Sequence, residues 1–320
     1  GKPGRGILTG PGDDAAVIRP SPGKDLVWTT DTLVEGIDFH LEWAGYRQAG
    51  YKALAANLSD IAAMGATPRY YLLTLGFPPS TSLAQIEQIF KGLSLLEKET
   101  GISLAGGDLT EAPNLFLCLT LIGETGKNGA VLRSGASAEN FLFVTGTLGD
   151  ARAGLEILQR EKRKGKEGTQ GVNYLVRRQL YPSPRLREGS LLNQKGLATG
   201  MMDISDGLAV DLQNFTEASA LGADILLPSL PLSPALIDYG RKTGKSPVEI
   251  ALTGGEDFEL LFSVSSATIN RVKSLIKRKI LSATLIGKLT RKSGIRYLNE
   301  SGKLVRISAS GFEHFKSRSS

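Results

Sequence analysis

Short apolar runs alternate with longer amphipathic segments through the first half of the chain. The run at residues 26–30 predicts a strand that ends at Asp31. Residues 47–64 repeat alanine and leucine at helical spacing, and Gly65 and Pro68 follow as stop signals, so this segment predicts a helix. The same patterns predict a strand at 70–75, a helix at 82–100 closed by Gly101, and a strand at 115–123.

The alternation starts again in the second half. Residues 141–146 predict a buried strand that leads into a helix at about Asp150. Further segments predict a strand at 200–204, a helix at 207–218, a strand at 258–264 and a helix at 267–277. The fold class that follows is α/β (α+β) with two domains.

We expect the domain boundary near residues 135–140, with an N-terminal domain at 1–137 and a C-terminal domain at 138–320. The first domain should have a mixed sheet with helices on one face. The second should be an α/β sandwich with its own sheet, interrupted by a loop at 162–171. The acidic residues described below would meet between the two domains.

The composition is that of an ordinary globular protein. The chain has 320 residues, of which 41% are hydrophobic and 22% are charged, enough for two separate cores. Its longest apolar runs, such as residues 115–122, are much shorter than the roughly 20 residues that span a bilayer. The first residues lack the apolar stretch of a signal peptide, and the single cysteine, Cys118, has no disulfide partner. We therefore expect a cytoplasmic protein without a membrane segment.

The formal net charge is +6, which alone would suit a nucleic-acid partner. Much of the excess lies in two clusters, at residues 160–166 and 273–279. The first cluster contains Gly and Glu and no aromatic residue, which favours a solvated loop. A net positive charge also suits small anionic phosphate substrates. We therefore expect no nucleic-acid partner.

Acidic residues recur beside apolar segments at five places. They are Asp13-Asp14 after Gly12, Asp31 after Thr29-Thr30, Asp60 after Ser59, Asp108 after Gly106-Gly107, and Asp203 with Asp206 around Ser205. Carboxylates brought together raise one another's pKa unless a cation neutralises them. Magnesium takes oxygen ligands and completes its shell with waters and phosphate oxygens. Together the clusters predict several magnesium ions that hold a polyphosphate, while one cysteine and two histidines argue against zinc.

Each motif also has an ordinary structural explanation when it is taken alone. The Gly12-Asp13-Asp14 segment suits a polar turn, and the Ser-Asp pairs at 59–60 and 205–206 suit helix N-caps. Gly106-Gly107, Gly254-Gly255 and Arg133 suit phosphate binding, and we expect Gly106-Gly107-Asp108 to follow a short apolar strand. A turn or a solvated surface explains each of the three too. The hypothesis of a metal and nucleotide site depends on the whole set.

No catalytic nucleophile pair stands out. His40 and His314 have no Ser or Cys partner motif, and the chain has neither a Walker A loop nor a protein-kinase signature. Phosphoryl transfer needs no covalent intermediate, because positioning and charge neutralisation by metals supply most of the catalysis.

Taken in order, these motifs resemble those of thiamine-monophosphate kinase. That family belongs to the superfamily of aminoimidazole ribonucleotide synthetase, selenophosphate synthetase and the hydrogenase maturation dehydratase. The resemblance runs from about Gly10 to about Phe315, and the matching segments are 12–17, 29–36, 52–66, 106–108, 203–208 and 254–260. The segments 57–66 and 255–260 look most like the thiamine branch. The reactive Cys or selenocysteine that selenophosphate synthetases carry near the N-terminus is absent from this sequence.

The resemblance implies in-line transfer of a phosphate from ATP to thiamine monophosphate, which gives ADP and thiamine diphosphate, as the last step of thiamine diphosphate biosynthesis. It implies magnesium ligands at Asp14, Thr29, Thr30, Asp31, Asp60, Asp108, Asp203 and Asp206. It implies ATP contacts at Gly107, Asp108, Arg133 and Ser205, and substrate contacts at Asp38, Glu256 and Phe312. The catalytic group would be Asp31, Asp60, Asp206 and Arg133, which would neutralise charge on the transferring phosphoryl group. A homodimer whose N-terminal strands form a shared barrel is implied as well.

One departure concerns the substrate site, since the family often has His where this chain has Asp38, with His40 two residues later. Two alternatives stay open. A related ATP-dependent synthetase acting on another small substrate would keep the magnesium–ATP site. A non-catalytic binder of nucleotide or nucleic acid is favoured only by the positive charge, and the acidic set would repel a polyanion.

Overall fold

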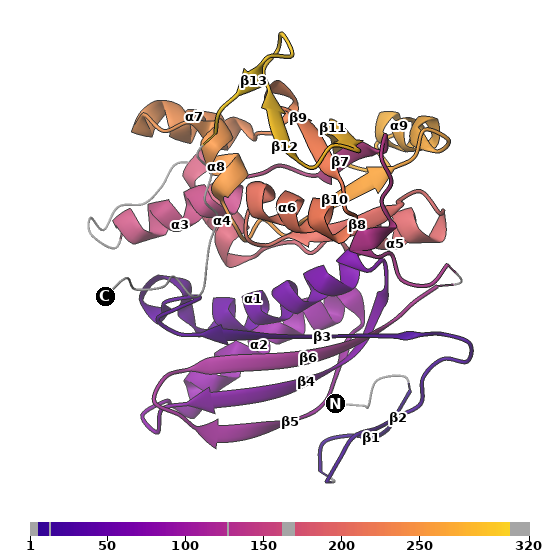
Figure 1. Cartoon of the computed structure of the whole chain (residues 1–320). Coiled ribbons are helices and arrows are strands. Elements are labelled where there is room, and N and C mark those ends of the chain that lie inside the picture. The colour runs from indigo at the N-terminus through magenta and orange to yellow at the C-terminus, as the bar shows by residue number, and fades with distance from the viewer. Residues whose placement is uncertain (1–5, 13, 127, 162–169, 308–320) are drawn as a thin grey trace, which may run out of the picture.

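The computed structural model describes residues 6–12, 14–126, 128–161 and 170–307. Two sheets lie one above the other in Figure 1, the first built from residues 26–124 and the second from residues 141–305. The predicted α/β class with mixed sheets is confirmed. Phe312, His314 and most of the basic cluster at 160–166 lie outside the described residues.

The N-terminal sheet is mixed and has four strands in the order β3-β6-β4-β5. Its strands are β3 (Leu26–Val34), β4 (Thr67–Phe77), β5 (Ser103–Glu111) and β6 (Phe116–Glu124). Antiparallel pairing joins β3 to β6 and β6 to β4, whereas β5 runs parallel to β4. The two edge strands are therefore β3 and β5, which carry several of the predicted site residues.

Alternation along β3 decides which side chains face the rest of the protein. Leu33 and Val27 join the core under helices α1 (Leu41–Ala63) and α2 (Leu83–Thr100), so the odd-numbered residues of β3 face that side. The even-numbered residues point to the opposite face, where Trp28 is 60% exposed. A small hairpin, β1 (Ile7–Thr9) with β2 (Val17–Ile18), packs on Tyr70 and Ile122 at one end of that face.

Helix α2 has the ends that the sequence predicts. Ser82 forms a capping box with Gln85 at its start, and Gly101 adopts a left-handed conformation at its end. Helix α1 begins six residues before the predicted start. Its first turn is separated from the rest by non-helical Gly45, whose φ is 68° and ψ is 161°.

Two strand predictions need correction. Strand β3 does not end at Asp31 but continues to Val34, because it pairs with β6 along its whole length. Gly106-Gly107-Asp108 does not follow a strand but lies within β5. A Cβ on Gly107 would lie 2.0 Å from the carbonyl oxygen of Leu73 on β4, so the close pairing of these strands requires glycine there.

The C-terminal sheet has seven strands in the order β13-β12-β9-β11-β7-β10-β8, and only the β12–β9 pair is parallel. Its strands are β7 (Phe141–Thr145), β8 (Gly200–Ile204), β9 (Gly222–Leu226), β10 (Glu259–Val264), β11 (Ala283–Thr290), β12 (Gly294–Leu298) and β13 (Leu304–Val305). Leu142 and Val144 enter one core while Phe143, between them, enters another, so both faces of the sheet are buried.

Helices cover this second sheet on both faces (Figure 1). They are α3 (Asp150–Glu161), α4 (Gln170–Leu180), α5 (Leu186–Gln194), α6 (Leu208–Ala218), α7 (Pro234–Thr243), α8 (Pro247–Thr253) and α9 (Ile269–Lys277), with short 3-10 turns η1 (Arg133–Gly135) and η2 (Leu227–Ser229). The sequence patterns predicted α3, α6 and α9 but not α4, α5, α7 or α8.

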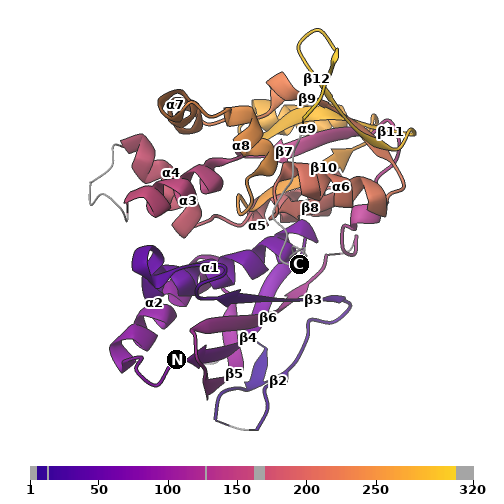
Figure 2. The same cartoon turned by 60° about the vertical axis from the view of Figure 1, so that its left-hand side comes forward.

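Helix α1 runs between the N-terminal sheet and the C-terminal half in both views (Figures 1 and 2). Its last residues, Ala62 and Ala63, belong to the same core as Phe143 and Phe262 of the second sheet. Helix α1 therefore packs against both the N-terminal and the C-terminal sheet. Its residues can contact acidic side chains from either sheet.

Candidate active site

Strand β3 and helix α1 bring together the first group of predicted ligands. Thr29 and Asp31 are odd-numbered residues of β3 and face α1. The Thr29 hydroxyl donates a hydrogen bond of 2.5 Å to Oδ2 of Asp60 on α1. Burial, with Asp60 and then Asp38 nearby, raises the pKa of Asp31 from 3.8 to about 6.

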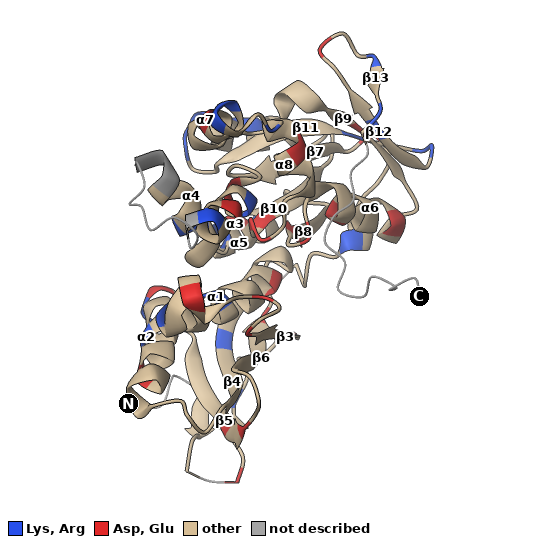
Figure 3. Cartoon of the chain, turned by 90° about the vertical axis from the view of Figure 1, so that its left-hand side faces the viewer, with Lys and Arg blue, Asp and Glu red and all other residues tan. Residues whose placement is uncertain are grey.

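The end of strand β8 adds a buried carboxylate from the other half. Asp203 is 4% exposed, and its Oδ2 accepts a hydrogen bond of 2.7 Å from the hydroxyl of Ser59, the residue before Asp60. Burial, with Asp60 nearby, raises the pKa of Asp203 to about 7, although Ser59 and Arg133 act in the opposite direction. The adjacent pair Ser59-Asp60 thus connects β3 to β8, and Figure 3 shows acidic residues on both sides of this junction.

Arg133 is the cation that acts on this group. Its side chain is exposed in η1. The pKa of Asp60 is raised by burial, while the hydrogen bond from Thr29 and the charge of Arg133 lower it. Asp60 therefore lies close enough to raise the pKa of both Asp31 and Asp203, and Arg133 lies close enough to lower the pKa of Asp60 and Asp203.

The turn after β8 is held by an acid that the sequence analysis missed. Oδ2 of Asp211 accepts hydrogen bonds of 3.1 Å from the backbone N–H groups of Ser205, Asp206 and Gly207. Burial, with Asp203 and Asp206 nearby, raises the pKa of Asp211 to about 7. An acid in the first turn of a predicted helix is a capping signal that could have identified it.

Glu256, a predicted substrate contact, lies where α1 meets the C-terminal half. Lys52 of α1 forms a salt bridge with its Oε1, at 2.5 Å. Gln179 of α4 donates a hydrogen bond of 2.6 Å from Nε2 to its Oε2. No local sequence pattern predicts that Lys52 or Gln179 contacts Glu256, so neither residue is among the predicted site residues.

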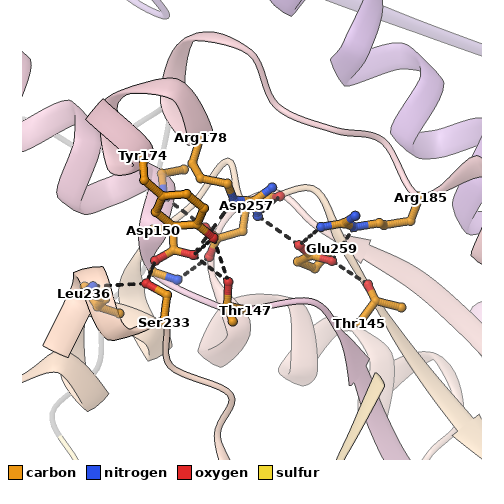
Figure 4. Close-up of polar contacts among 12 residues, drawn as sticks. Thr145, Thr147, Asp150, Tyr174, Arg178, Arg185, Ser233, Leu236, Asp257 and Glu259 are labelled. Atoms are coloured by element: carbon orange, nitrogen blue, oxygen red, sulfur yellow. Dashed lines mark hydrogen bonds and ion pairs between the residues drawn. The ribbon is translucent and has the colours of Figure 1, made fainter. Parts of the chain in front are cut away.

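A buried polar network includes Asp257 and Glu259, which follow Glu256 in the chain (Figure 4). Glu259 is fully buried and accepts hydrogen bonds from Arg185 at 2.6 and 2.5 Å, from Arg178 at 2.9 Å and from the Thr145 hydroxyl at 2.6 Å. Pairing a buried carboxylate with two guanidinium groups is necessary because an unpaired charge there would be costly. The network fixes β10, α4 and the start of α5 to one another.

Asp257 and Asp150 continue this network. Asp257 accepts hydrogen bonds from the N–H groups of Gly149, at 2.5 Å, and Ala151, at 3.1 Å, at the start of α3. Burial nevertheless raises its pKa to about 7. Asp150 accepts hydrogen bonds from Ser233, Thr147 and Tyr174. The segment that contains Glu256 is therefore anchored on a rigid base.

Several predicted site residues do not join the acidic group within one chain. The side chain of Thr30 points to the opposite face of the sheet, where it bonds to the carbonyl oxygen of Leu119. Gly107 and Asp108 are exposed on β5, the far edge strand. Asp14 is exposed in the loop between β1 and β2, which reaches β5 through Ala16.

The remaining substrate candidates have different positions. Asp38 lies in the turn after β3, where its Oδ2 accepts a hydrogen bond of 2.8 Å from the N–H of Val34. Its charge contributes to the raised pKa of Asp31, so it borders the acidic group. Phe312 lies outside the described residues.

The donor set fits magnesium in its chemistry. Asp31, Asp60 and Asp203 carry the hard oxygen atoms that magnesium takes as ligands, and burial is the largest cause of the raised pKa of each. Among the described residues, however, no three acidic, His or Cys side chains converge closely enough to form a complete metal site. A cation here would need further oxygen atoms, from a phosphate, from water or from another chain.

Comparison with known proteins places the chain in a class. Residues 12–125 match the family described as AIR synthase related protein, N-terminal domain, and residues 137–298 match the corresponding C-terminal domain. The first match spans the N-terminal sheet, and the second spans every strand of the C-terminal sheet except β13. Thiamine-monophosphate kinase of Escherichia coli (strain K12) is 37% identical over 310 residues, which cover 97% of this chain and 92% of that protein. The chain belongs to the thiamine-monophosphate kinase family.

Solved structures agree with this assignment. A structure of thiamine-monophosphate kinase from Stenotrophomonas maltophilia K279a has a TM-score of 0.83 and 35% identity, covering 94% of this chain and 93% of that one. The structure described as AaThiL complexed with AMPPCP and TMP has a TM-score of 0.81 and 32% identity, covering 93% and 89%. Within the part of the chain that the structure describes, no helix has the length and apolar character needed to cross a membrane.

Proposed function

We propose that this chain transfers the terminal phosphate of ATP to thiamine monophosphate and releases ADP and thiamine diphosphate. The observation that carries the proposal is the junction of α1 with β3 and β8. At this junction Asp60 accepts a hydrogen bond from the Thr29 hydroxyl, and the neighbouring Ser59 donates a hydrogen bond to Asp203. Acids from two separate sheets are thereby assembled beside Arg133, in a chain whose relatives are named for this reaction. The cytoplasmic location expected from the sequence stays part of the proposal.

In this proposal Asp31, Asp60, Asp203 and Asp206 hold magnesium, and Thr29 orients Asp60 through its hydrogen bond. Bound magnesium would supply positive charge to the phosphate chain of ATP. Arg133 contributes a planar guanidinium, which suits recognition of a phosphoryl group that gains charge during transfer. Asp211 keeps the Ser205–Gly207 turn in one conformation, so that Ser205 and Asp206 meet ATP in a fixed geometry.

We propose further that two copies of the chain complete each site. In one chain Asp31 on β3 and Gly107 on β5 lie in the same row across four strands, because Asp31 pairs with Leu119, Leu119 with Leu73, and Leu73 with Gly107. Three strand spacings separate them by roughly 14 Å. That is too far for Asp31 and Asp108 to hold one magnesium ion, whose ligands lie about 2.1 Å from the metal.

A two-fold related copy removes this difficulty. If β5 of one chain pairs with β3 of the other, the segment that contains Gly107 and Asp108 comes beside the part of β3 that contains Asp31, and both sheet edges are closed. The exposed Trp28 on the even-numbered face of β3 supports such an arrangement, because it would be covered inside a shared barrel.

The test of function is the release of ADP from magnesium-ATP with and without thiamine monophosphate, with the product checked for thiamine diphosphate. We expect release only with that substrate. Asp31→Asn and Asp206→Asn should each lower the rate by at least about 100-fold, because they remove charge-neutralising ligands. Asp238→Asn is the matched control, since Asp238 is a half-exposed acid on α7 paired with Lys242.

Three other results would contradict the proposal. ADP release without thiamine diphosphate would indicate a related synthetase with another acceptor. Binding of ATP without any turnover would indicate a non-catalytic nucleotide binder. A steep salt dependence of binding to DNA or RNA would indicate a nucleic-acid partner instead.

A further inference from the structure

Two side chains from different halves of the molecule hold the carboxylate of Glu256. Lys52 comes from α1 and Gln179 from α4, and each contacts a different oxygen atom, at 2.5 and 2.6 Å. Lys52 is 5% exposed and Gln179 is 2% exposed, while the side chain of Glu256 is 32% exposed. The two partners are therefore buried behind a carboxylate that still reaches the surface.

The backbone around Glu256 is held in an unusual conformation. Glu256 and Phe258 have positive φ values of 67° and 50°, which residues other than glycine rarely adopt. Such conformations are strained and persist only when the surroundings enforce them. Here the N–H of Glu256 bonds to the carbonyl oxygen of Ser205, at 2.8 Å, and the N–H of Phe258 bonds to that of Ile204, at 3.0 Å. This backbone ties Glu256 directly to the turn that carries Ser205 and Asp206.

The geometry leaves acceptors available for a ligand. A carboxylate has about four lone-pair sites, of which Lys52 and Gln179 occupy one on each oxygen. Among the described residues, Oε1 of Gln179 also has no hydrogen-bond partner. Lys52 and Gln179 line a small cavity of about 10 Å³ together with Phe39 and Trp43, which has room for about one water molecule. Only the carboxylate of Glu256 reaches the surface, so its free lone pairs are the acceptors that a ligand with N–H donors can use.

We infer that Lys52 and Gln179 are positioning residues for substrate recognition. They orient the carboxylate of Glu256 so that its free lone pairs accept hydrogen bonds from the aminopyrimidine end of thiamine monophosphate. The inference rests on the proposed function and on the predicted contact of Glu256 with that substrate. Lys52 acts through Glu256 and makes no contribution to the binding of ATP.

A purely structural role for the Lys52–Glu256 pair leads to a different expectation. As a simple connection between the two halves, the pair would affect the free energy of unfolding, and its loss would change both substrates' kinetics together or neither. A positioning role changes the Michaelis constant for one substrate only. The two roles can therefore be separated by kinetics.

The experiment compares Lys52→Met, Glu256→Gln and the double variant, with KM measured separately for thiamine monophosphate and for ATP. We expect Lys52→Met to raise KM for thiamine monophosphate about tenfold, the lower range of losses when a ligand loses its supporting partner, with KM for ATP and kcat within about twofold. In the Glu256→Gln background, Lys52→Met should cause no further change, because coupled residues are not additive. Lys245→Met is the control, since it removes another Lys–Glu pair of 2.7 Å, between Lys245 and Glu156, that does not include Glu256.

Gln179→Leu provides a second variant in case Lys52→Met does not fold. It keeps the volume but cannot donate to Glu256, so it should also raise KM for thiamine monophosphate alone. The inference would be overturned if the effects of Lys52→Met and Glu256→Gln on KM for thiamine monophosphate multiplied in the double variant. It would also be overturned if Lys52→Met raised KM for both substrates equally, or if its kinetics were identical to those of Lys245→Met. A wild-type protein that forms no thiamine diphosphate would instead overturn the proposed function itself, and the inference with it.

Discussion

At the scale of single residues, the burial of Asp203 makes the free energy of unfolding depend on pH. Its pKa is raised from 3.8 to about 7, so the folded chain binds a proton that the unfolded chain has already released in this range. The free energy of unfolding contributed by this group therefore falls as the pH rises from about 4 to about 7. Magnesium should reverse the loss by neutralising the group.

We predict that Asp203→Asn melts at least about 2 °C above the wild type at pH 7.5 without magnesium, because the substitution removes a repelled charge. At pH 5.5 the difference should shrink, since the wild-type carboxyl is then protonated. Thermal melts at both pH values, with and without magnesium chloride, measure this. Magnesium should raise the melting temperature of the wild type at pH 7.5 and leave that of Asp203→Asn nearly unchanged. Melting of Asp203→Asn below the wild type at pH 7.5 without magnesium would contradict the argument.

At the scale of elements, the close crossing of α1 and α2 positions the residues that α1 brings to the site. A Cβ on Gly92 of α2 would lie 2.0 Å from the carbonyl oxygen of Arg47, and a Cβ on Gly50 of α1 would lie 2.2 Å from that of Ile89. In both cases the obstacle is backbone, which cannot turn aside as a side chain can. The two glycines let the helices approach closely, and Lys52, Ser59 and Asp60 depend on the resulting position of α1.

We predict that Gly92→Ala lowers the free energy of unfolding by about 1–3 kcal/mol, the usual cost of overpacking, despite the better helix propensity of alanine. It should also lower the rate of thiamine diphosphate formation, because α1 would shift relative to β8. Denaturant unfolding and steady-state kinetics test both effects. Lys91→Ala is the control on the same helix, since the Lys91 side chain is 57% exposed. Equal stability of the two variants would show that the helices can separate without cost.

At the scale of the whole molecule, the proposed dimer makes each site depend on two chains. Asp31 would come from one copy and Asp108 from the other. A dimer of one Asp31→Asn chain with one Asp108→Asn chain would then contain one site that lacks both acids and one site that is intact.

We predict that Asp31→Asn and Asp108→Asn are each nearly inactive alone, and that co-expression of the two restores about a quarter of the wild-type activity. Random pairing makes half of the dimers mixed, and each mixed dimer has one working site. The measurement is thiamine diphosphate formation per chain after co-expression from two plasmids. Two Asp31→Asn plasmids serve as the control. If sites are complete within one chain, co-expression will restore nothing.

Much of the local structure could be predicted because it depends on neighbouring residues. The start of α2 at Ser82 and its end at Gly101 follow from capping, which involves only a few successive positions. The predictions that failed concern pairing between distant segments. Strand β3 continues past Asp31 because β6 lies beside it, and Gly107 lies inside β5 because β4 approaches closely. No pattern within either segment reports its neighbour.

The candidate site, too, has features that the sequence predicts and features that only the tertiary structure decides. The residue types and their order, from Asp14 to Glu256, were sufficient to reveal the family. That these carboxylates bind magnesium stays a prediction, which rests on side-chain type. Only the tertiary structure decided that Ser59 meets Asp203, that Lys52 and Gln179 hold Glu256, and that Thr30 faces away. These relations join residues far apart in the sequence, and they depend on helix α1 packing between two sheets, which no local periodicity encodes.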